Sequence, residues 1–235
     1  EYEGRYEQPD FARFYEDSGI LRARKGHYSY TVMREKSNFL YFHNGTSKLE
    51  MKVAGSFCEH RAFKAETMEI LADGTAHLHQ TMRGWYYLPF EEKPETSDWW
   101  KMDHTKRAQL HGPDMIFDVE VTEAENGIDV HIVNTGIDRA PLRVELAFDA
   151  GCRVETEHFA ADGAEGGGIV AKSGTLTASR GRYAIEAGPC FGAHGFTAGK
   201  FGSMKRTEGC YTVYLTDYSC FEHTISLRAK PSLHD

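Results

Sequence analysis

The sequence predicts an all-β protein, a large antiparallel β-sandwich of the supersandwich type in which hairpins connect successive strands. Three observations carry this prediction. Short runs of alternating apolar and polar residues recur along the 235-residue chain, and turn-forming residues separate them. No segment longer than about ten residues carries the apolar stripe of an amphipathic helix. Strands at such short intervals are typical of two stacked sheets.

The strands are expected in order along the chain. Asn44-Gly45, Asp73-Gly74 and Asn126-Gly127 each mark a hairpin turn, because such turns need residues that adopt positive φ. A short helix is expected over residues 10–15, ended by Asp17-Ser18-Gly19. The predicted strands cover residues 28–33, 39–42, 49–53, 68–71, 76–79, 117–121, 128–132, 142–148, 169–170, 174–178, 183–186, 211–215 and 224–227.

The chain is long enough to bury a core of its own. We expect residues 1–10 to be a linker and residues 11–235 to form a single β-sandwich domain. A composition shift marks a division between sub-sheets near residues 112–114. The first residues lack the basic start and apolar run of a signal peptide, so no targeting segment is predicted. Localisation stays open, and the parent of such a domain can be secreted or periplasmic.

Composition excludes several classes of function. The net charge is −8 with Lys and Arg scattered, which argues against nucleic-acid binding, and no apolar run approaches a membrane span. The five cysteines show no metal-binding spacing, and we expect them to be reduced. Cys210 and Cys220 flank one predicted strand and form the one pair considered for a disulfide. No cofactor-binding motif occurs, so no cofactor is predicted.

The strongest functional signal is an aromatic segment that starts at residue 84 and holds all three tryptophans. Long loops in compact domains are usually functional or disordered, and disordered segments are poor in aromatic residues. An aromatic face offers apolar area to a sugar ring, and nearby cations suit carboxylate or sulfate groups. The predicted substrate-binding residues here are Tyr86, Trp99, Trp100, His104 and Arg107.

A structural interpretation of the same segment is about as strong. Trp99 and Trp100 can instead fold back and plug one end of the sandwich. Trp85 or Tyr87, at the end of a predicted strand, is expected in the core. The sequence alone leaves binding and plugging open.

A weaker signal is the triplet Glu59-His60-Arg61 just past a predicted strand. It combines an acid, a base that titrates near neutral pH and a fixed cation, a set that suits proton abstraction beside a sugar carboxylate. We therefore predict a supporting catalytic role for His60 and Arg61. A solvated turn or a structural salt bridge is the favoured alternative, because any surface turn can hold such residues.

Two further segments carry histidines. His77 and His79 alternate on one strand, so both imidazoles face the same way. A metal would need a third ligand such as His131 on a neighbouring strand, and no metal site is predicted. His194 lies in a glycine-rich loop, residues 188–196, and is a further candidate for substrate binding. The alternative for His194 is packing at a sheet corner.

The run Phe14-Tyr15-Glu16-Asp17-Ser18-Gly19-Ile20-Leu21-Arg22-Ala23-Arg24 resembles the entry into the C-terminal β-sandwich of heparinase II/III-like polysaccharide lyases. The strand His27-Tyr28-Ser29-Tyr30-Thr31-Val32 follows it as in that family. The resemblance covers the first third of the chain. It implies a β-domain that completes the cleft of a lyase acting by β-elimination on uronic-acid sugars.

This chain also departs from that family in one motif. Family members often carry an H-x-H-x-D-x-x-S-F signature near this point, whereas this chain has Arg34-Glu35-Lys36-Ser37-Asn38-Phe39, without His or Asp. This departure puts the family's metal site and its site histidine in doubt. The proton-shuttling tyrosine of such lyases comes from a helical toroid, so the expected partners are a polysaccharide or oligosaccharide and a helical domain of a parent chain.

Three classes of function follow from the sequence. The chain is the non-autonomous β-domain of a polysaccharide lyase, a non-catalytic carbohydrate-binding or architectural module, or a protein-interaction sandwich. The first predicts unsaturated product only when the chain is joined to its helical partner. The second predicts sugar binding without product, and the third predicts no sugar affinity.

Overall fold

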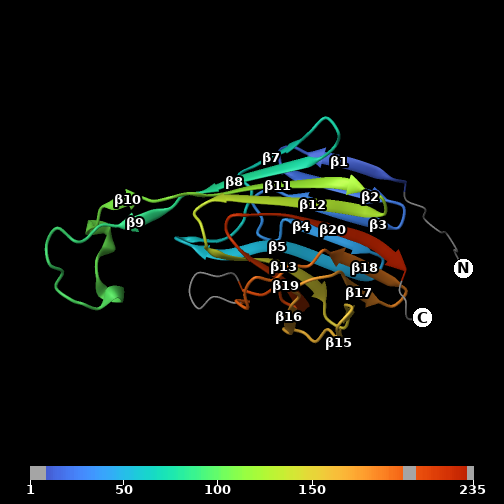
Figure 1. Cartoon of the computed structure of the whole chain (residues 1–235). Coiled ribbons are helices and arrows are strands. Elements are labelled where there is room, and N and C mark those ends of the chain that lie inside the picture. Colours follow the sequence, from blue (N-terminus) through green and yellow to red (C-terminus); the bar gives the residue numbers. More distant parts are fainter. Residues whose placement is uncertain (1–8, 198–204, 232–235) are drawn as a thin grey trace, which may run out of the picture.

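The computed structural model describes residues 9–197 and 205–231, with the side chain of residue 56 left out, and it confirms the all-β sandwich (Figure 1). Two nine-stranded sheets stack against each other, and a two-stranded ribbon projects from one end. The linker predicted for residues 1–10 lies mostly outside the described residues.

The first sheet is antiparallel except for one pair, β16 with β19. Its spatial order is β1 (Phe11–Tyr15), β2 (Ile20–Lys25), β3 (Tyr28–Met33), β4 (Leu40–Asn44), β5 (Ser47–Phe57), β13 (Pro141–Asp149), β19 (Cys210–Tyr218) and β16 (Gly168–Val170), with β6 (His60–Ala62) paired to the far end of β5.

The second sheet covers the first. Its spatial order is β15 (Ala160–Asp162), β14 (Arg153–Glu155), β17 (Leu176–Arg180), β18 (Tyr183–Gly188), β20 (Phe221–Pro231), β12 (Gly127–Gly136), β11 (Met115–Ala124), β8 (Ala76–Met82) and β7 (Thr67–Ile70). The separate ribbon pairs β9 (Trp85–Tyr87) with β10 (Gln109–His111).

One continuous apolar core fills the space between the sheets. Burial along β8 and β11 alternates residue by residue, as expected for strands with one buried and one wet face. Aromatic rings lie at its centre: Phe63 is 5.3 Å from Phe39 and 5.6 Å from Phe117 between ring centroids. All three are fully buried.

The hairpins form where predicted, but two turns sit one residue away from the Asn-Gly positions. Asn44 pairs with Ser47 inside the ladder, so the turn lies at residues 45–46, and buried Asn44 donates to the carbonyls of Ala184 and Lys230 at 2.7 and 2.8 Å. Asn126 takes the positive φ of 54°, and Gly127 joins β12. A Cβ at residue 127 would lie 1.9 Å from the carbonyl oxygen of residue 227, so close approach requires glycine there.

The helix predicted over residues 10–15 is wrong. Residues 11–15 form β1, which pairs in register with β2, a strand that the sequence patterns missed. A helix of one or two turns is marginal in water, and sheet pairing satisfies the same backbone groups. Gly19, with φ of 60°, closes the hairpin.

Cys210 and Cys220 stand just inside and just beyond the two ends of β19, so they cannot form a disulfide with each other. All five cysteines are free. Cys58 and Cys220 are exposed, whereas Cys152, Cys190 and Cys210 are buried.

Helix is confined, among the residues the structure describes, to two 3₁₀ turns, and none of it could cross a membrane.

Candidate functional site

The aromatic segment forms an arm, residues 84–113, that projects from one end of the sandwich (Figure 1). The two chain passes come together tightly at its base. The Gly84 carbonyl accepts the Gly112 amide at 2.9 Å, and a Cβ on Gly84 would lie 1.9 Å from the Pro113 carbonyl oxygen. Asp114 accepts the Gly84 amide at 3.1 Å. The glycine is therefore required where the arm leaves the sandwich. Residues 112–114, near which a sub-sheet division is predicted, lie at this base, and the strands on either side of the arm, β8 and β11, pair within one sheet.

One face of the ribbon is apolar and exposed. Tyr86 and Leu110 are cross-strand partners, 53% and 56% exposed. The ring of Tyr86 lies over Gly112, where a Cβ would be 2.6 Å from it. The arm thus presents Tyr86 flat on its outer surface, supported by a residue with no side chain.

The other face holds a cluster of rings around Arg107. Its guanidinium carbon is 4.8 Å from the ring centroid of Tyr87, 5.1 Å from Phe90 and 5.4 Å from Trp99. The His104 ring stacks on Tyr87 at 5.5 Å and contacts Trp99 at 4.0 Å. Cation–π contacts of this kind stabilise a loop that has no apolar core beneath it.

Backbone contacts complete this packing. The Arg107 Nε donates to the Leu88 carbonyl at 2.7 Å, and the His104 Nε2 bonds the Trp99 carbonyl at 2.8 Å. Two 3₁₀ turns, η1 (Trp99–Lys101) and η2 (His104–Lys106), begin at aspartate caps. At the second cap, the hydroxyl and amide of Thr105 bond the Asp103 carboxylate and lower its pKa.

The predicted binding residues of the arm therefore divide into two groups. His104 and Arg107 are used within the arm and hold its shape. Trp99 is 49% exposed and Trp100 is 81% exposed, and, like Tyr86 on the apolar face of the ribbon, both are open to solvent. The alternative interpretation, in which Trp99 and Trp100 plug one end of the sandwich, is wrong, because the arm points away from it (Figure 1).

Trp85 and Tyr87 are also not part of the sandwich core. Their rings lie 4.8 Å apart within the arm and remain half-buried.

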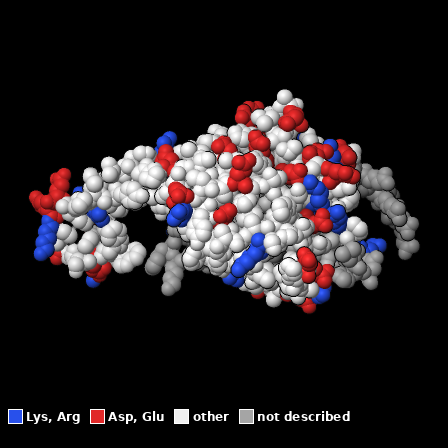
Figure 2. All heavy atoms as spheres, in the orientation of Figure 1, with Lys and Arg blue, Asp and Glu red and all other residues white. Residues whose placement is uncertain are grey.

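Figure 2 shows that, on the face in view, the shaft of the arm is largely free of charged side chains, and charges gather toward its free end. Charged residues flank Trp99 and Trp100, where Lys101 and Asp98 form an ion pair at 3.3 Å.

His60 and Arg61 lie at the base of the arm, on β6. The turn before β6 contacts the arm directly: the Cys58 sulfur is 3.4 Å from both the amide nitrogen and the carbonyl oxygen of Trp85. His60 is half-buried and Arg61 is exposed. Both line an open pocket of about 430 Å³. Their predicted catalytic role stays a prediction.

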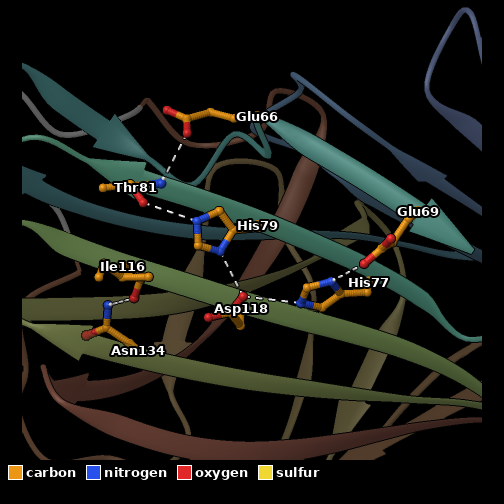
Figure 3. A network of polar contacts seen from close by, with 8 residues as sticks. All are labelled: Glu66, Glu69, His77, His79, Thr81, Ile116, Asp118 and Asn134. Atoms are coloured by element: carbon orange, nitrogen blue, oxygen red, sulfur yellow. Dashed lines mark hydrogen bonds and ion pairs between the residues drawn. The ribbon is translucent and has the colours of Figure 1, made fainter. Parts of the chain in front are cut away.

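His77 and His79 share one carboxylate on the outer face of the second sheet (Figure 3). The Asp118 Oδ1 is 3.2 Å from His77 Nε2 and 2.8 Å from His79 Nδ1. The remaining ring nitrogens contact Glu69 and Thr81.

His131, the third ligand considered, contacts Thr224 and Glu222 instead. Across the described parts of the chain, no group of three or more His, Cys, Asp or Glu side chains is placed to hold a metal ion.

His194 is 8% exposed, and its ring bonds only to backbone. Nε2 lies 3.0 Å from the carbonyl oxygens of Leu142 and Asp217, and Nδ1 accepts the Phe196 amide at 3.1 Å. Both nitrogens are engaged, so this geometry favours the corner-packing interpretation, and we leave His194 out of the proposed binding surface.

Sequence reasoning missed Leu110 and Gln80. Leu110 shares the exposed ribbon face with Tyr86 because of strand pairing that no local pattern indicates. Gln80 lines the pocket beside His60 and Arg61. The signal available for Gln80 was its place at an apolar position of an alternating strand.

The chain matches no protein-family model, no curated protein and no solved structure.

Proposed function

We propose that this chain is a glycan-binding β-sandwich domain of a carbohydrate-active protein, and that the arm is its binding surface. The observation that carries the proposal is Trp100, 81% exposed on a projecting arm beside Trp99. Large exposed aromatic surface is rare unless it binds something. A flat, amphipathic ring suits the apolar face of a sugar and loses little conformational entropy on binding.

The arm is pre-organised for this role. The cluster around Arg107 fixes Trp99, and Gly112 supports Tyr86 from below. A surface that is already ordered loses less freedom when a ligand binds. A surface on such an arm therefore binds a glycan without needing a deep pocket.

Affinity electrophoresis tests the proposal. The chain and its Trp100→Ala variant run through gels cast with a panel of acidic and neutral polysaccharides. We expect at least one glycan to retard the chain and Trp100→Ala to lose most of the retardation. Tyr15→Ala is the matched control, because Tyr15 is 42% exposed but lies on β1.

Two outcomes contradict the proposal. One is that no glycan retards the chain, which favours a protein-interaction sandwich. The other is that Trp100→Ala and Tyr15→Ala behave alike, which places any glycan site elsewhere.

A second candidate is the β-domain of a heparinase II/III-like lyase. The position of His60 and Arg61 beside an open pocket at the base of the arm favours it. This candidate predicts that the isolated chain forms no product, whereas the chain joined to a helical toroid domain forms unsaturated uronic-acid product. His60→Ala should then lower product formation, measured by ultraviolet absorbance, without changing retardation in the gels. Absence of product in the joined form contradicts it.

A further inference from the structure

The pocket near the base of the arm lies between β6 of the first sheet and β8 of the second. β6 and the segment after it supply one wall, and β8 supplies the other. Its volume of about 430 Å³ falls in the range of small-molecule sites. Its lining residues are Glu59, His60, Arg61, Ala62, Lys64 and Gln80.

Gln80 is the unusual member of this set. It occupies an inward position of β8, between Leu78 and Met82, and is only 6% exposed. Its Oε1 accepts the backbone amide of Lys64 at 2.7 Å. Among the described residues the side-chain NH₂ group has no hydrogen-bond partner, and the exposed remainder of Gln80 lines the pocket. This nitrogen is not sealed off from solvent, so it can donate to water or to a ligand in the pocket.

The charges around the mouth favour an anion. Arg61 and Lys64 are exposed, and their side chains form no ion pair within the described part of the chain, although the net charge of the chain is −8. Nearby Arg83, by contrast, pairs with Asp114 at 3.3 Å. Glu59 is the one acidic side chain in the lining, so, with His60 counted as neutral, two cations and one carboxylate leave a single positive charge. That balance matches a monoanion better than a phosphate dianion.

We propose that this pocket binds the carboxylate of a small molecule. The Arg61 guanidinium is a planar donor pair that matches a carboxylate, and the Gln80 NH₂ group donates from the floor of the pocket. Lys64 adds a second charge at the mouth. This site is separate from Tyr86, Trp99 and Trp100, and it does not depend on the arm binding a glycan.

Nuclear magnetic resonance of the ¹⁵N-labelled full chain tests the proposal. The probes are acetate and acetamide, which have nearly the same shape and differ in charge, at constant pH and ionic strength. We expect acetate to shift the Lys64 amide and the Gln80 side-chain resonances with saturation, and acetamide to leave them unchanged. Equal responses to the two probes overturn the proposal.

Variants assign the binding groups. Arg61→Gln should weaken acetate binding about tenfold, since a charge-assisted bond is lost. Gln80→Glu keeps the acceptor for the Lys64 amide but puts a negative charge in the pocket, and it should abolish binding. If Gln80→Glu fails to fold, Arg61→Gln combined with Lys64→Gln decides, because both side chains are exposed.

Arg182→Gln is the matched control. Arg182 is an exposed arginine in the turn between β17 and β18, near the opposite end of β5 from the pocket. It should bind acetate like the unchanged chain. Loss of binding in Arg182→Gln, or unchanged binding in Arg61→Gln/Lys64→Gln, contradicts the assignment of the site.

Discussion

The sandwich and the arm use the same residue types in opposite ways. In the sandwich, rings such as Phe63 and Phe117 are fully buried and pack against other rings. In the arm, Trp99 and Trp100 stay exposed, and a single arginine stands at the centre of the ring cluster. Burial therefore stabilises the sandwich, whereas local cation–π and capping contacts order the arm and leave its aromatic surface open.

The largest effect is expected from truncating a core ring. Phe117→Ala should lower the free energy of unfolding by about 3–5 kcal/mol, because it removes a buried ring and leaves a cavity. Leu110→Ala on the exposed ribbon face should change it by less than about 0.5 kcal/mol. Urea unfolding followed by circular dichroism measures both. Similar effects in the two variants would remove the distinction between sandwich and arm.

Cysteine reactivity gives the next largest effect. Burial raises the pKa of Cys152, Cys190 and Cys210 to about 11, two units above the ordinary value of 9.0. Their thiolate fraction at neutral pH is therefore lower than that of an ordinary cysteine, and burial also restricts the access of a reagent. We expect a thiol reagent to label Cys58 and Cys220 rapidly and the other three only on unfolding. Mass spectrometry of the labelled peptides checks this, and fast labelling of Cys152 would contradict the burial.

A smaller effect is expected from the centre of the arm. Arg107→Met keeps the aliphatic stem but removes the cation, so the arm should lose about 1–2 kcal/mol of local stability. Faster hydrogen exchange at the Leu88 amide, which bonds the Ala108 carbonyl, would report it. The sandwich amides should not change. Lys106→Met is the control, and equal exchange in both variants would contradict the role of Arg107.

The smallest effect concerns pH and the sandwich alone. Burial of His43, followed by its cross-strand neighbour Lys48, lowers the pKa of the imidazole below 6.5. The unfolded chain therefore binds the proton more tightly than the folded chain. The contribution of His43 to the free energy of unfolding is present in full above the unfolded pKa, and it is lost as the pH falls through the folded pKa. His43→Gln should lose less stability on acidification than the unchanged chain, measured by urea midpoints on both sides of neutrality. An identical pH response in His43→Gln and the unchanged chain would contradict the lowered pKa of His43.

Sequence patterns predicted the sandwich well because its strands obey local rules. Alternation along β11 and β12 follows directly from one buried and one wet face. The exact turn residues were harder, since the buried bonds of Asn44 and the close approach at Gly127 come from strands far along the chain. β1 and β2 were missed or misassigned because their pairing, not local propensity, determines their structure.

The candidate site was predictable only in part. Its aromatic composition singled out the arm, but no local pattern distinguishes exposed Trp100 from Trp99, half of whose surface is covered, or shows that Arg107 contacts three rings. Gln80 joins the pocket because two sheets meet there, and a strand pattern carries no information about the facing sheet. Contacts between segments that are far apart in the chain could not be predicted from the sequence.

The most direct measurement of the arm as a binding surface is intrinsic fluorescence, because all three tryptophans lie in the arm. A glycan that retards the chain in gels should quench or shift the tryptophan emission with saturation. Trp85→Phe should keep most of the change, and Trp100→Ala should lose it. A glycan that binds the chain while the emission stays constant, or a full change in Trp100→Ala, would contradict the account.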